Sequence, residues 1–301
     1  MTEVRHRYAS VLGHRVFYRE AGPADAPVVV LLHGFPTSSR MFRHLIPALA
    51  DRFHVIAPDH LGFGHSATPP ADEFAYGFDA LADVTEGLLA HLRLERYALY
   101  VQDYGAPIGW RLALRHPHAV TAIVTQNGNA YDEGFVPDFW APVWAYAQSP
   151  GPTTEAAVRG ALSEEAIRWQ YLHGVAEPEL VDPDTWATDH REISRPGLDR
   201  IQLDLFRDYA TNLPLYPRLH EYFRATRVPL LAIWGAGDEI FGPDGARAFA
   251  RDLPDARIQL VPGGGHFLLE SHLDTVAGAM RAFLEQALRR NTRDTQTPAP
   301  A

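Results

Sequence analysis

The chain has 301 residues and carries 27 Lys and Arg against 37 Asp and Glu, a net charge of −10, and it contains no Cys. This length suits one large α/β domain or two modest ones. Without Cys there is no disulfide, thiolate metal site, iron–sulfur cluster or thiol nucleophile. The longest apolar run, Val28–Leu32, is too short to cross a bilayer.

The charge pattern and the amino-terminal residues narrow the partners and the compartment. No basic stripe interrupts the acidic balance, so we expect no nucleic-acid partner. The first twenty residues show no apolar stretch between a basic start and a small-residue cleavage site. We therefore expect a cytoplasmic protein that neither spans nor binds a membrane.

Strands and helices alternate over the first 130 residues. β-rich runs bounded by Gly or Pro predict strands at 15–20, 28–32, 53–57, 97–101 and 121–125. Apolar residues at intervals of three or four predict a helix at 78–92, and a second helix follows at 105–115. This alternation is typical of a parallel sheet covered on both faces.

The pattern changes after residue 127 and then resumes. A segment rich in Trp, Tyr and Pro has helical pieces at 164–173 and 198–209 and no clear strand. Strands at 228–234 and 257–261 and a closing helix at 269–288 follow. We expect an α/β core from 1–130 and 225–288, a helical cap from 131–224 over a covered pocket, and a polar, disordered tail from 289–301.

Four turns that follow predicted strands contain the candidate catalytic residues, because the reactive crevice of a parallel sheet lies beyond the carboxyl ends of its strands. They read HGFP at 33–36, QDYGA at 102–106, GAGD at 235–238 and GGGH at 263–266. In chain order they supply Asp103, Asp238 and His266. None of the eight serines lies in a G-x-S-x-G motif.

This ordered set resembles the α/β-hydrolase superfamily, and within it the branch of epoxide hydrolases and haloalkane dehalogenases, over roughly 15–288. The resemblance implies that Asp103 is the nucleophile of a strand-turn-helix elbow, that His266 is the base and that Asp238 is the acid that orients it. One departure is Val101, which stands where the elbow usually has Gly. A carboxylate that attacks a saturated carbon forms an alkyl ester, which water can cleave.

Supporting roles follow from the same resemblance. The backbone N–H groups of Phe35 and Tyr104 are expected to form the oxyanion hole, and the bond between Phe35 and Pro36 is expected to be cis. Asp132 and Glu133 are second choices for the acid. Glu239 is expected to be solvated.

The leaving group decides between the two activities. Dehalogenases hold halide with N–H donors, typically a Trp after the nucleophile, but Tyr104 stands there. Epoxide hydrolases protonate the ring oxygen with two cap tyrosines, for which we choose Tyr171 and Tyr209. Phe206 takes the place of a tyrosine in an alternative alignment. Four cap tryptophans offer an indole N–H for halide, so dehalogenation remains the alternative: Trp140, Trp144, Trp169 and Trp186.

Two other patterns are weak evidence for a cofactor or metal site. Residues 62–67 have the form G-x-G-x-x-A, but the prolines at 69 and 70 break any helix that would hold a pyrophosphate. His116 and His118 lack the companions of a metal site. We expect no cofactor, no metal, a small apolar organic substrate, and a chain that could form a homodimer. A non-catalytic small-molecule receptor on the same fold is the rival from another class.

Overall fold

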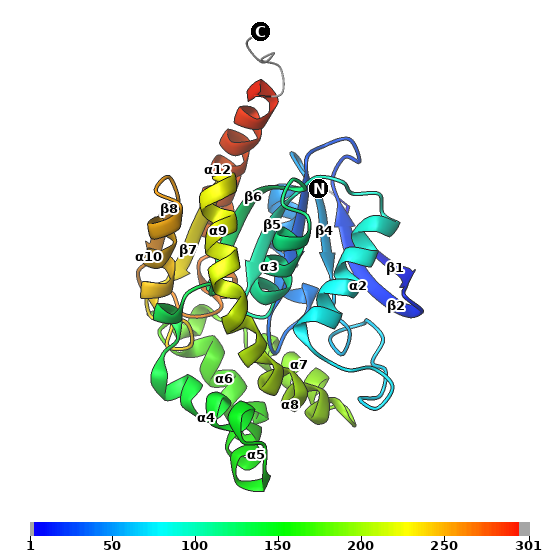
Figure 1. The fold of residues 1–301 in the computed structure, drawn as a ribbon, viewed down its shortest axis with the longest axis vertical. Helices are drawn as coiled ribbons and strands as arrows, with labels where there is room; N and C mark the ends of the chain where they lie inside the picture. Colours follow the sequence, from blue (N-terminus) through cyan, green and yellow to red (C-terminus); the bar gives the residue numbers. More distant parts are fainter. Residues whose placement is uncertain (1–2, 295–301) are drawn as a thin grey trace.

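The computed structural model describes residues 3–294, and its centre is one eight-stranded sheet in the order β1-β2-β4-β3-β5-β6-β7-β8. The strands, visible at the centre of Figure 1, are β1 Arg5–Val11, β2 His14–Ala21, β3 Val28–Leu32, β4 His54–Pro58, β5 Tyr97–Gln102, β6 Val120–Gln126, β7 Leu230–Gly235 and β8 Arg257–Val261. Strands β4, β3, β5, β6, β7 and β8, which are neighbours in that order, are parallel to one another.

The sheet is mixed, because its first two strands are antiparallel. β1 pairs antiparallel with β2, and β2 pairs antiparallel with β4. The sequence analysis missed β1: five of its seven residues are exposed, so its charged side chains hide the strand pattern. The other predicted strands are present, with ends that differ by up to two residues.

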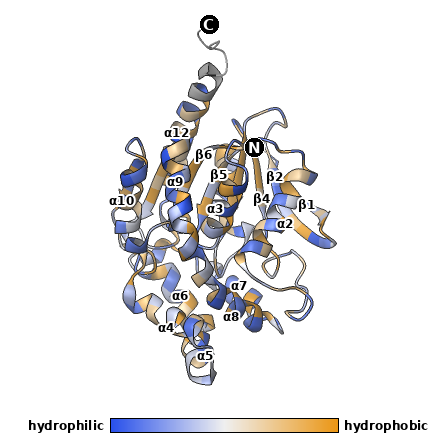
Figure 2. Ribbon diagram, in the orientation of Figure 1, coloured by the Kyte–Doolittle hydropathy of each residue, from blue (hydrophilic) through white to orange (hydrophobic). Residues whose placement is uncertain are grey.

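Helices cover both faces of the sheet. On one face α2 (Phe78–His91) contacts α3 (Gly105–Arg115), and α9 (Tyr216–Thr226) lies between α3 and α10 (Pro243–Asp252). On the other face α12 (Leu273–Asp294) contacts α1 (Leu45–Leu49), α11 (Leu268–Ser271) and β6. The central strands β5 and β6 are buried at every residue, and they are among the most apolar parts of Figure 2. This burial on both faces is why their runs are continuously apolar.

A helical insertion at about 137–226 separates β6 from β7 and forms a cap at one end of the sheet (Figure 1). Its α-helices before α9 are α4 Pro137–Gln148, α5 Pro152–Arg159, α6 Glu164–Leu172, α7 Pro183–Ile193 and α8 Leu198–Asp208. Short 3-10 helices interrupt the chain at η1 Ser39–Phe42, η2 Asp132–Gly134, η3 Gly160–Leu162, η4 Pro178–Leu180 and η5 Tyr209–Leu215. Because the cap follows the carboxyl end of β6, it lies at the end of the sheet where the candidate residues emerge.

The carboxyl-terminal boundary differs from the expectation. The helix predicted at 269–288 is two helices, α11 and α12, and α12 continues to Asp294. The predicted tail therefore begins at least six residues too early, because 289–294 are helical; residues 295–301 of that predicted tail lie outside the described residues. Within residues 3–294, none of the helices combines the length and the apolar character that crossing a bilayer requires.

Candidate active site

Asp103 stands at the turn between β5 and α3. Its φ is +47°, in the left-handed region that an L-residue seldom adopts, and the turn leads directly into the helix. Gly105 makes this approach feasible, because a Cβ there would lie 2.1 Å from the carbonyl oxygen of Leu32. Asp103 is 6% exposed. Its carboxylate is therefore buried at the carboxyl ends of the strands, under the cap.

Two backbone N–H groups hold one oxygen of this carboxylate. Phe35 N donates to Asp103 Oδ1 over 2.7 Å, and Tyr104 N donates to the same atom over 2.6 Å. Gly34 allows the close approach, because a Cβ at this position would lie 2.5 Å from Oδ1. The bond between Phe35 and Pro36 is cis, as expected from the resemblance. The second oxygen, Oδ2, remains free of these donors.

His266 and Asp238 meet beside Asp103. His266 Nδ1 lies 2.9 Å from Asp238 Oδ2, and His266 Nε2 lies 3.8 Å from Asp103 Oδ2. Asp238 also accepts from the Asn127 side chain at 2.5 Å and from the backbone N of Ile240 at 2.7 Å. These bonds fix the carboxylate, so it can hold the proton on Nδ1 and leave the Nε2 lone pair facing the nucleophile.

Burial and neighbouring charges shift the titration of this pair. Burial raises the pKa of Asp103, against the lowering effects of His266 and of the N–H groups of Phe35 and Tyr104. Burial by itself would lower the pKa of His266, but the charge and hydrogen bond of Asp238, with a further contribution from Asp103, raise that pKa above its usual value. Burial therefore opposes the charge of Asp103, and the neighbouring His266 and the two N–H groups offset part of this effect.

Gln102 is a site residue that the sequence analysis quoted but gave no role. Its Nε2 lies 2.9 Å from His266 Nε2, while its Oε1 is buried without a hydrogen-bond partner. Because Nδ1 of His266 donates to Asp238, Nε2 is the acceptor of the Gln102 amide proton. The signal available in the sequence was position: Gln102 is the last residue of β5, directly before the nucleophile.

Tyr209, Tyr104 and Trp140 are aromatic side chains in contact over the turn at Asp103, and we call this group the aromatic roof. The Tyr209 ring lies 6.0 Å from the Tyr104 ring and 4.4 Å from the Trp140 ring. The phenol hydroxyls of Tyr104 and Tyr209 are both buried without a hydrogen-bond partner among residues 3–294. Burial raises the pKa of Tyr209 well above its usual value, and Tyr216 and Asp103 raise it further. Tyr209 is thus a protonated donor with nothing to donate to.

The segment that carries Tyr209 is anchored to the core. Buried Arg111 of α3 donates to Asn212 Oδ1 over 2.6 Å, and Asp208 accepts from the backbone N of Phe78 over 2.7 Å. These contacts tie η5 and the end of α8 to the first turn of α2 and the second turn of α3. The roof is therefore positioned by the same helices that form the elbow.

Tyr171 is placed differently. Its ring stacks on Phe267 with centroids 3.9 Å apart, and its hydroxyl donates to Asp189 of α7. Burial raises the pKa of Asp189 to about 6, partly offset by the hydrogen bonds from Tyr171 and Thr37. The Tyr171 proton is engaged inside the cap, so this geometry gives the predicted donor role no support.

The remaining candidates are distributed as follows. The Trp140 indole donates to the carbonyl oxygen of Ile240 at 2.8 Å, so it is not free for halide. Phe206 points its ring at Phe35, 5.2 Å away. Glu133 pairs with Arg251 at the surface, and Glu239 is exposed and pairs with His173. Asp132 is exposed as well, so neither second-choice acid reaches His266.

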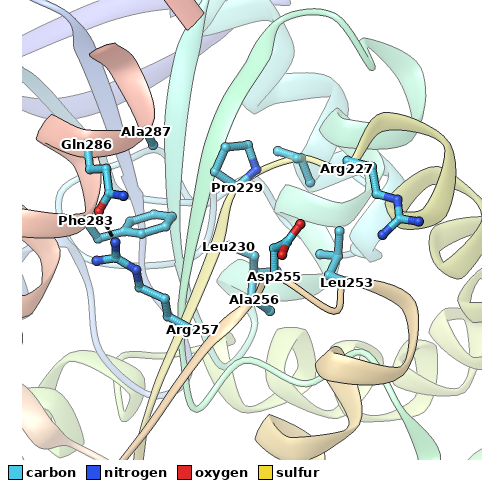
Figure 3. A pocket seen from close by; sticks show the side chains of 11 residues that line it. Arg227, Pro229, Leu230, Leu253, Asp255, Ala256, Arg257, Phe283, Gln286 and Ala287 are labelled. Carbon is cyan, nitrogen blue, oxygen red and sulfur yellow. Dashed lines mark hydrogen bonds between the residues drawn. The ribbon is translucent and has the colours of Figure 1, made fainter. Parts of the chain in front are cut away.

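The described residues form several cavities away from the triad, of which two are notable. A groove of about 550 Å³ opens between α4 and α6 and reaches Glu239, the residue after the acid. A small cavity of about 90 Å³ lies beside the first residues of β7 and β8, lined by groups such as Pro229, Arg257 and Phe283 (Figure 3). Since Asp238 and His266 follow the opposite ends of these strands, this cavity is remote from the catalytic groups. Between residues 3 and 294, no group of three metal-ligating side chains is arranged to hold an ion.

Comparisons with known proteins agree with this geometry. Residues 27–273 match the α/β-hydrolase fold family. The chain is 44% identical over 268 residues to an uncharacterized hydrolase of Saccharomyces cerevisiae, YNR064C, which covers 88% of this chain and 91% of the relative. It is 27% identical to a haloalkane dehalogenase of Bradyrhizobium diazoefficiens, with 94% of each chain covered.

A solved structure shows the same likeness. The crystal structure of epoxide hydrolase A from Mycobacterium thermoresistibile matches 94% of this chain and 98% of its own, with a TM-score of 0.74 and 26% identity. Sequence and structure relatives thus fall in the branch of dehalogenases and epoxide hydrolases. The chain belongs to the α/β-hydrolase fold family.

Proposed function

We propose that this chain is a hydrolase that opens epoxides through an alkyl ester on Asp103. The observation that carries the proposal is that the two oxygens of Asp103 have different contacts. Oδ1 accepts two backbone N–H bonds, while Oδ2 lies 3.8 Å from Nε2 of His266. Serine chemistry would need a hydroxyl at this apex, and a carboxylate occupies it.

In the first step Oδ2 attacks a ring carbon of the epoxide. A bond forms between Oδ2 and that carbon, the carbon–oxygen bond of the ring breaks, and the ring oxygen takes up the proton of a donor. Tyr209 is the proposed donor, because its hydroxyl is buried, protonated and unpartnered near Asp103. The product is a hydroxyalkyl ester whose carbonyl oxygen is Oδ1.

In the second step water cleaves the ester. His266 Nε2 takes a proton from water, whose oxygen attacks Cγ of Asp103, and Asp238 stabilises the imidazolium through Nδ1. The negative charge of the tetrahedral intermediate develops on Oδ1, where the N–H groups of Phe35 and Tyr104 already point. Collapse breaks the bond between Cγ and Oδ2, and the diol leaves with the proton that His266 took from water. Asp103 is left as a carboxylic acid, whose proton passes to the Tyr209 phenolate and restores both groups.

Haloalkane dehalogenation is the second candidate, supported by the similarity to the Bradyrhizobium enzyme. It uses the same nucleophile and base but must stabilise a halide. Here Phe35 and Tyr104 carry no side-chain N–H, and the Trp140 indole is bonded to Ile240. These facts favour an alkoxide, which a phenol can protonate, over a halide, although the phenol hydroxyls of Tyr104 and Tyr209 offer a weaker alternative.

An isotope experiment tests the ester route. With excess enzyme in H₂¹⁸O, one turnover of styrene oxide is expected to place ¹⁸O in Asp103 and none in the diol, because the diol leaves with Oδ2. Repeated turnover then carries the label into product. Parallel assays with 1-bromobutane and p-nitrophenyl acetate compare the leaving groups. A diol fully labelled in the first turnover would mean direct attack by water and would exclude the nucleophile role of Asp103.

A further inference from the structure

The groove between α4 and α6 contains a side-chain amide without a hydrogen-bond partner. Gln170 of α6 lines this groove and is 3% exposed, and its side chain makes no hydrogen bond within residues 3–294. The amide is not sealed in the interior as that of Gln202 is, so it keeps surface that a ligand in the groove can contact. Enclosing an amide without a partner destabilises the folded state. A ligand in the groove would supply the missing partner.

The helical spacing of α6 turns Gln170 toward the groove. Ala166 and Trp169 also line the groove, and with Gln170 they lie within an arc of about 100° around the helix. Ile167 and Tyr171 lie further round on the buried side of α6, and neither of them lines the groove. Gln170 therefore lies where the groove face of α6 meets its buried face, which explains how its amide is enclosed and still accessible.

The groove is acidic. Asp138 lies in the first turn of α4, Glu165 lies in the first turn of α6, and Glu239 follows β7. The described residues that line the groove include no Lys, Arg or His. Glu239 pairs with His173 over 2.9 Å, whereas Asp138 and Glu165 take part in no ion pair within residues 3–294. Acidic residues suit the amino end of any helix, so it is the unpartnered amide beside them that indicates a ligand. Together these groups favour a ligand that is positively charged and donates hydrogen bonds.

Aromatic rings from both helices complete the lining. The rings of Phe139 on α4 and Trp169 on α6 have centroids 6.2 Å apart and planes that differ by 13°. Such rings cover the apolar part of a ligand, and the π electrons of a ring face attract a cation. The two helices lie next to each other in the cap (Figure 1), and the groove of about 550 Å³ between them is in the size range of small-molecule sites.

We propose that this groove binds a protonated organic amine with an apolar body. The ammonium group donates a hydrogen bond to the side-chain oxygen of Gln170, and the carboxylates of Asp138 and Glu165 supply the opposite charge. The apolar body packs against Phe139 and Trp169. The site uses none of the triad residues, so the proposal goes beyond the proposed function and does not depend on epoxide opening.

Three ligands of similar shape test the proposal. 2-Phenylethylammonium, 2-phenylethanol and 3-phenylpropanoate each carry a phenyl ring on a two-carbon chain, and their end groups are positive, neutral and negative. We expect isothermal titration calorimetry on the full chain to show binding of the ammonium ion, with the alcohol about tenfold weaker and the carboxylate weaker still. Added NaCl should weaken binding of the ammonium ion alone. No binding of the ammonium ion at millimolar concentration, or equal binding of the alcohol, overturns the proposal.

Two variants locate the ligand, each with a matched control. Gln170→Met removes the amide and should weaken binding of 2-phenylethylammonium about tenfold, whereas Leu172→Met, on α6 but outside the groove, should not.

Glu165→Gln should weaken binding about threefold. Its control is Glu164→Gln, the same change of charge at the preceding residue, which does not line the groove. Because Glu165 is exposed, this variant also keeps the test valid should Gln170→Met fold poorly. Wild-type affinity in both Gln170→Met and Glu165→Gln would place the ligand elsewhere and overturn the proposal.

Discussion

The amide of Gln102 donates to Nε2 of His266 across 2.9 Å, so the lone pair that must accept a proton from water is already occupied. The other ring nitrogen is held by Asp238. This arrangement describes the neutral form of His266, which carries its proton on Nδ1. Water can reach the base only when it displaces the Gln102 amide, whose Oε1 has no partner to hold the side chain in place.

Removing this amide should move the pH dependence of ester hydrolysis. A donor to the Nε2 lone pair stabilises neutral His266, so Gln102→Met should raise the pKa of His266 further above its usual value. Since hydrolysis needs the neutral base, the acidic limb of the rate profile should shift to higher pH by ~0.5–1 unit, the equivalent of one hydrogen bond. Single-turnover rates between pH 5 and 9 measure the shift.

Gln126→Met serves as the control for that profile. Gln126 donates to the carbonyl oxygen of His266 over 2.9 Å and so touches the same residue without touching the ring. It should leave the midpoint of the acidic limb unchanged. Identical midpoints for wild type and Gln102→Met would show that the Gln102 amide does not bond the base in solution.

His266→Gln should separate the two chemical steps. Oδ2 of Asp103 can still attack without the imidazole, but water loses its base, and such base catalysis is typically worth ~10² to 10⁴ in rate. The ester should accumulate, and intact-mass spectrometry should show the protein heavier by one substrate molecule. Peptide mapping should place the addition on Asp103. An unmodified mass, with a substrate that the wild-type enzyme turns over, would contradict the scheme.

Tyr209→Phe and Tyr171→Phe form a matched pair of cap variants. The Tyr209 hydroxyl is unpartnered, whereas the Tyr171 hydroxyl donates to Asp189. Loss of a proton donor to the opening ring should slow ester formation in Tyr209→Phe by ~10²-fold. Tyr171→Phe should instead lower the melting temperature and leave the rate of ester formation near the wild-type value. Stopped-flow measurements on styrene oxide compare them, and equal slowing in both would reject the assignment of Tyr209.

The core and the triad could be predicted from the sequence because their signals are local. β3, α3 and β8 were predicted with the bounds that the structure has. β3 and α3 are largely buried, so their apolar patterns have clear ends, whereas the edge strand β8 is only partly buried. Asp103, Asp238 and His266 each follow such a strand, and parallel strands place their carboxyl ends together. Chain order was therefore sufficient to bring the three residues to one edge.

The cap residues could not be ranked in the same way, because their roles depend on contacts between helices. Tyr171 and Tyr209 look equivalent in the sequence, and only the position of Asp189, eighteen residues after Tyr171, separates them. Gln102 carries no motif, since an amide is informative only when its partner, or the lack of one, is known. β1 was missed because an exposed edge strand lacks the apolar pattern.

Two buried histidines near the elbow should make stability depend on pH. Burial lowers the pKa of His33 to about 4, partly offset by the hydrogen bond from its Nδ1 to the carbonyl oxygen of Gly34, and burial also lowers the pKa of His60. In the unfolded chain these groups take up protons near pH 6.5. The folded state should therefore lose stability as the pH falls from about 6.5 to about 4.

The lowered pKa of His33 sets the size of the expected loss in the free energy of unfolding. For His33 alone, roughly 3 kcal/mol is lost across the window, at ~1.4 kcal/mol for each unit of pKa. Urea denaturation at pH 7.5 and 4.5 measures the difference in the free energy of unfolding, and NMR titration of the imidazole signals identifies the groups. An imidazole of His33 that titrates near 6.5 in the folded protein would show that its burial carries no penalty.

Gln202→Met should stabilise the folded protein, because Gln202 of α8 is a buried side chain whose amide is unpaired within residues 3–294. The amide is 0% exposed and unpaired, so the folded state carries a desolvation penalty of ~1–3 kcal/mol that methionine, similar in length and apolar, does not have. Urea denaturation in the absence of substrate should show a free energy of unfolding higher by about that amount. A variant less stable than wild type without ligand would mean that Gln202 is paired inside the cap.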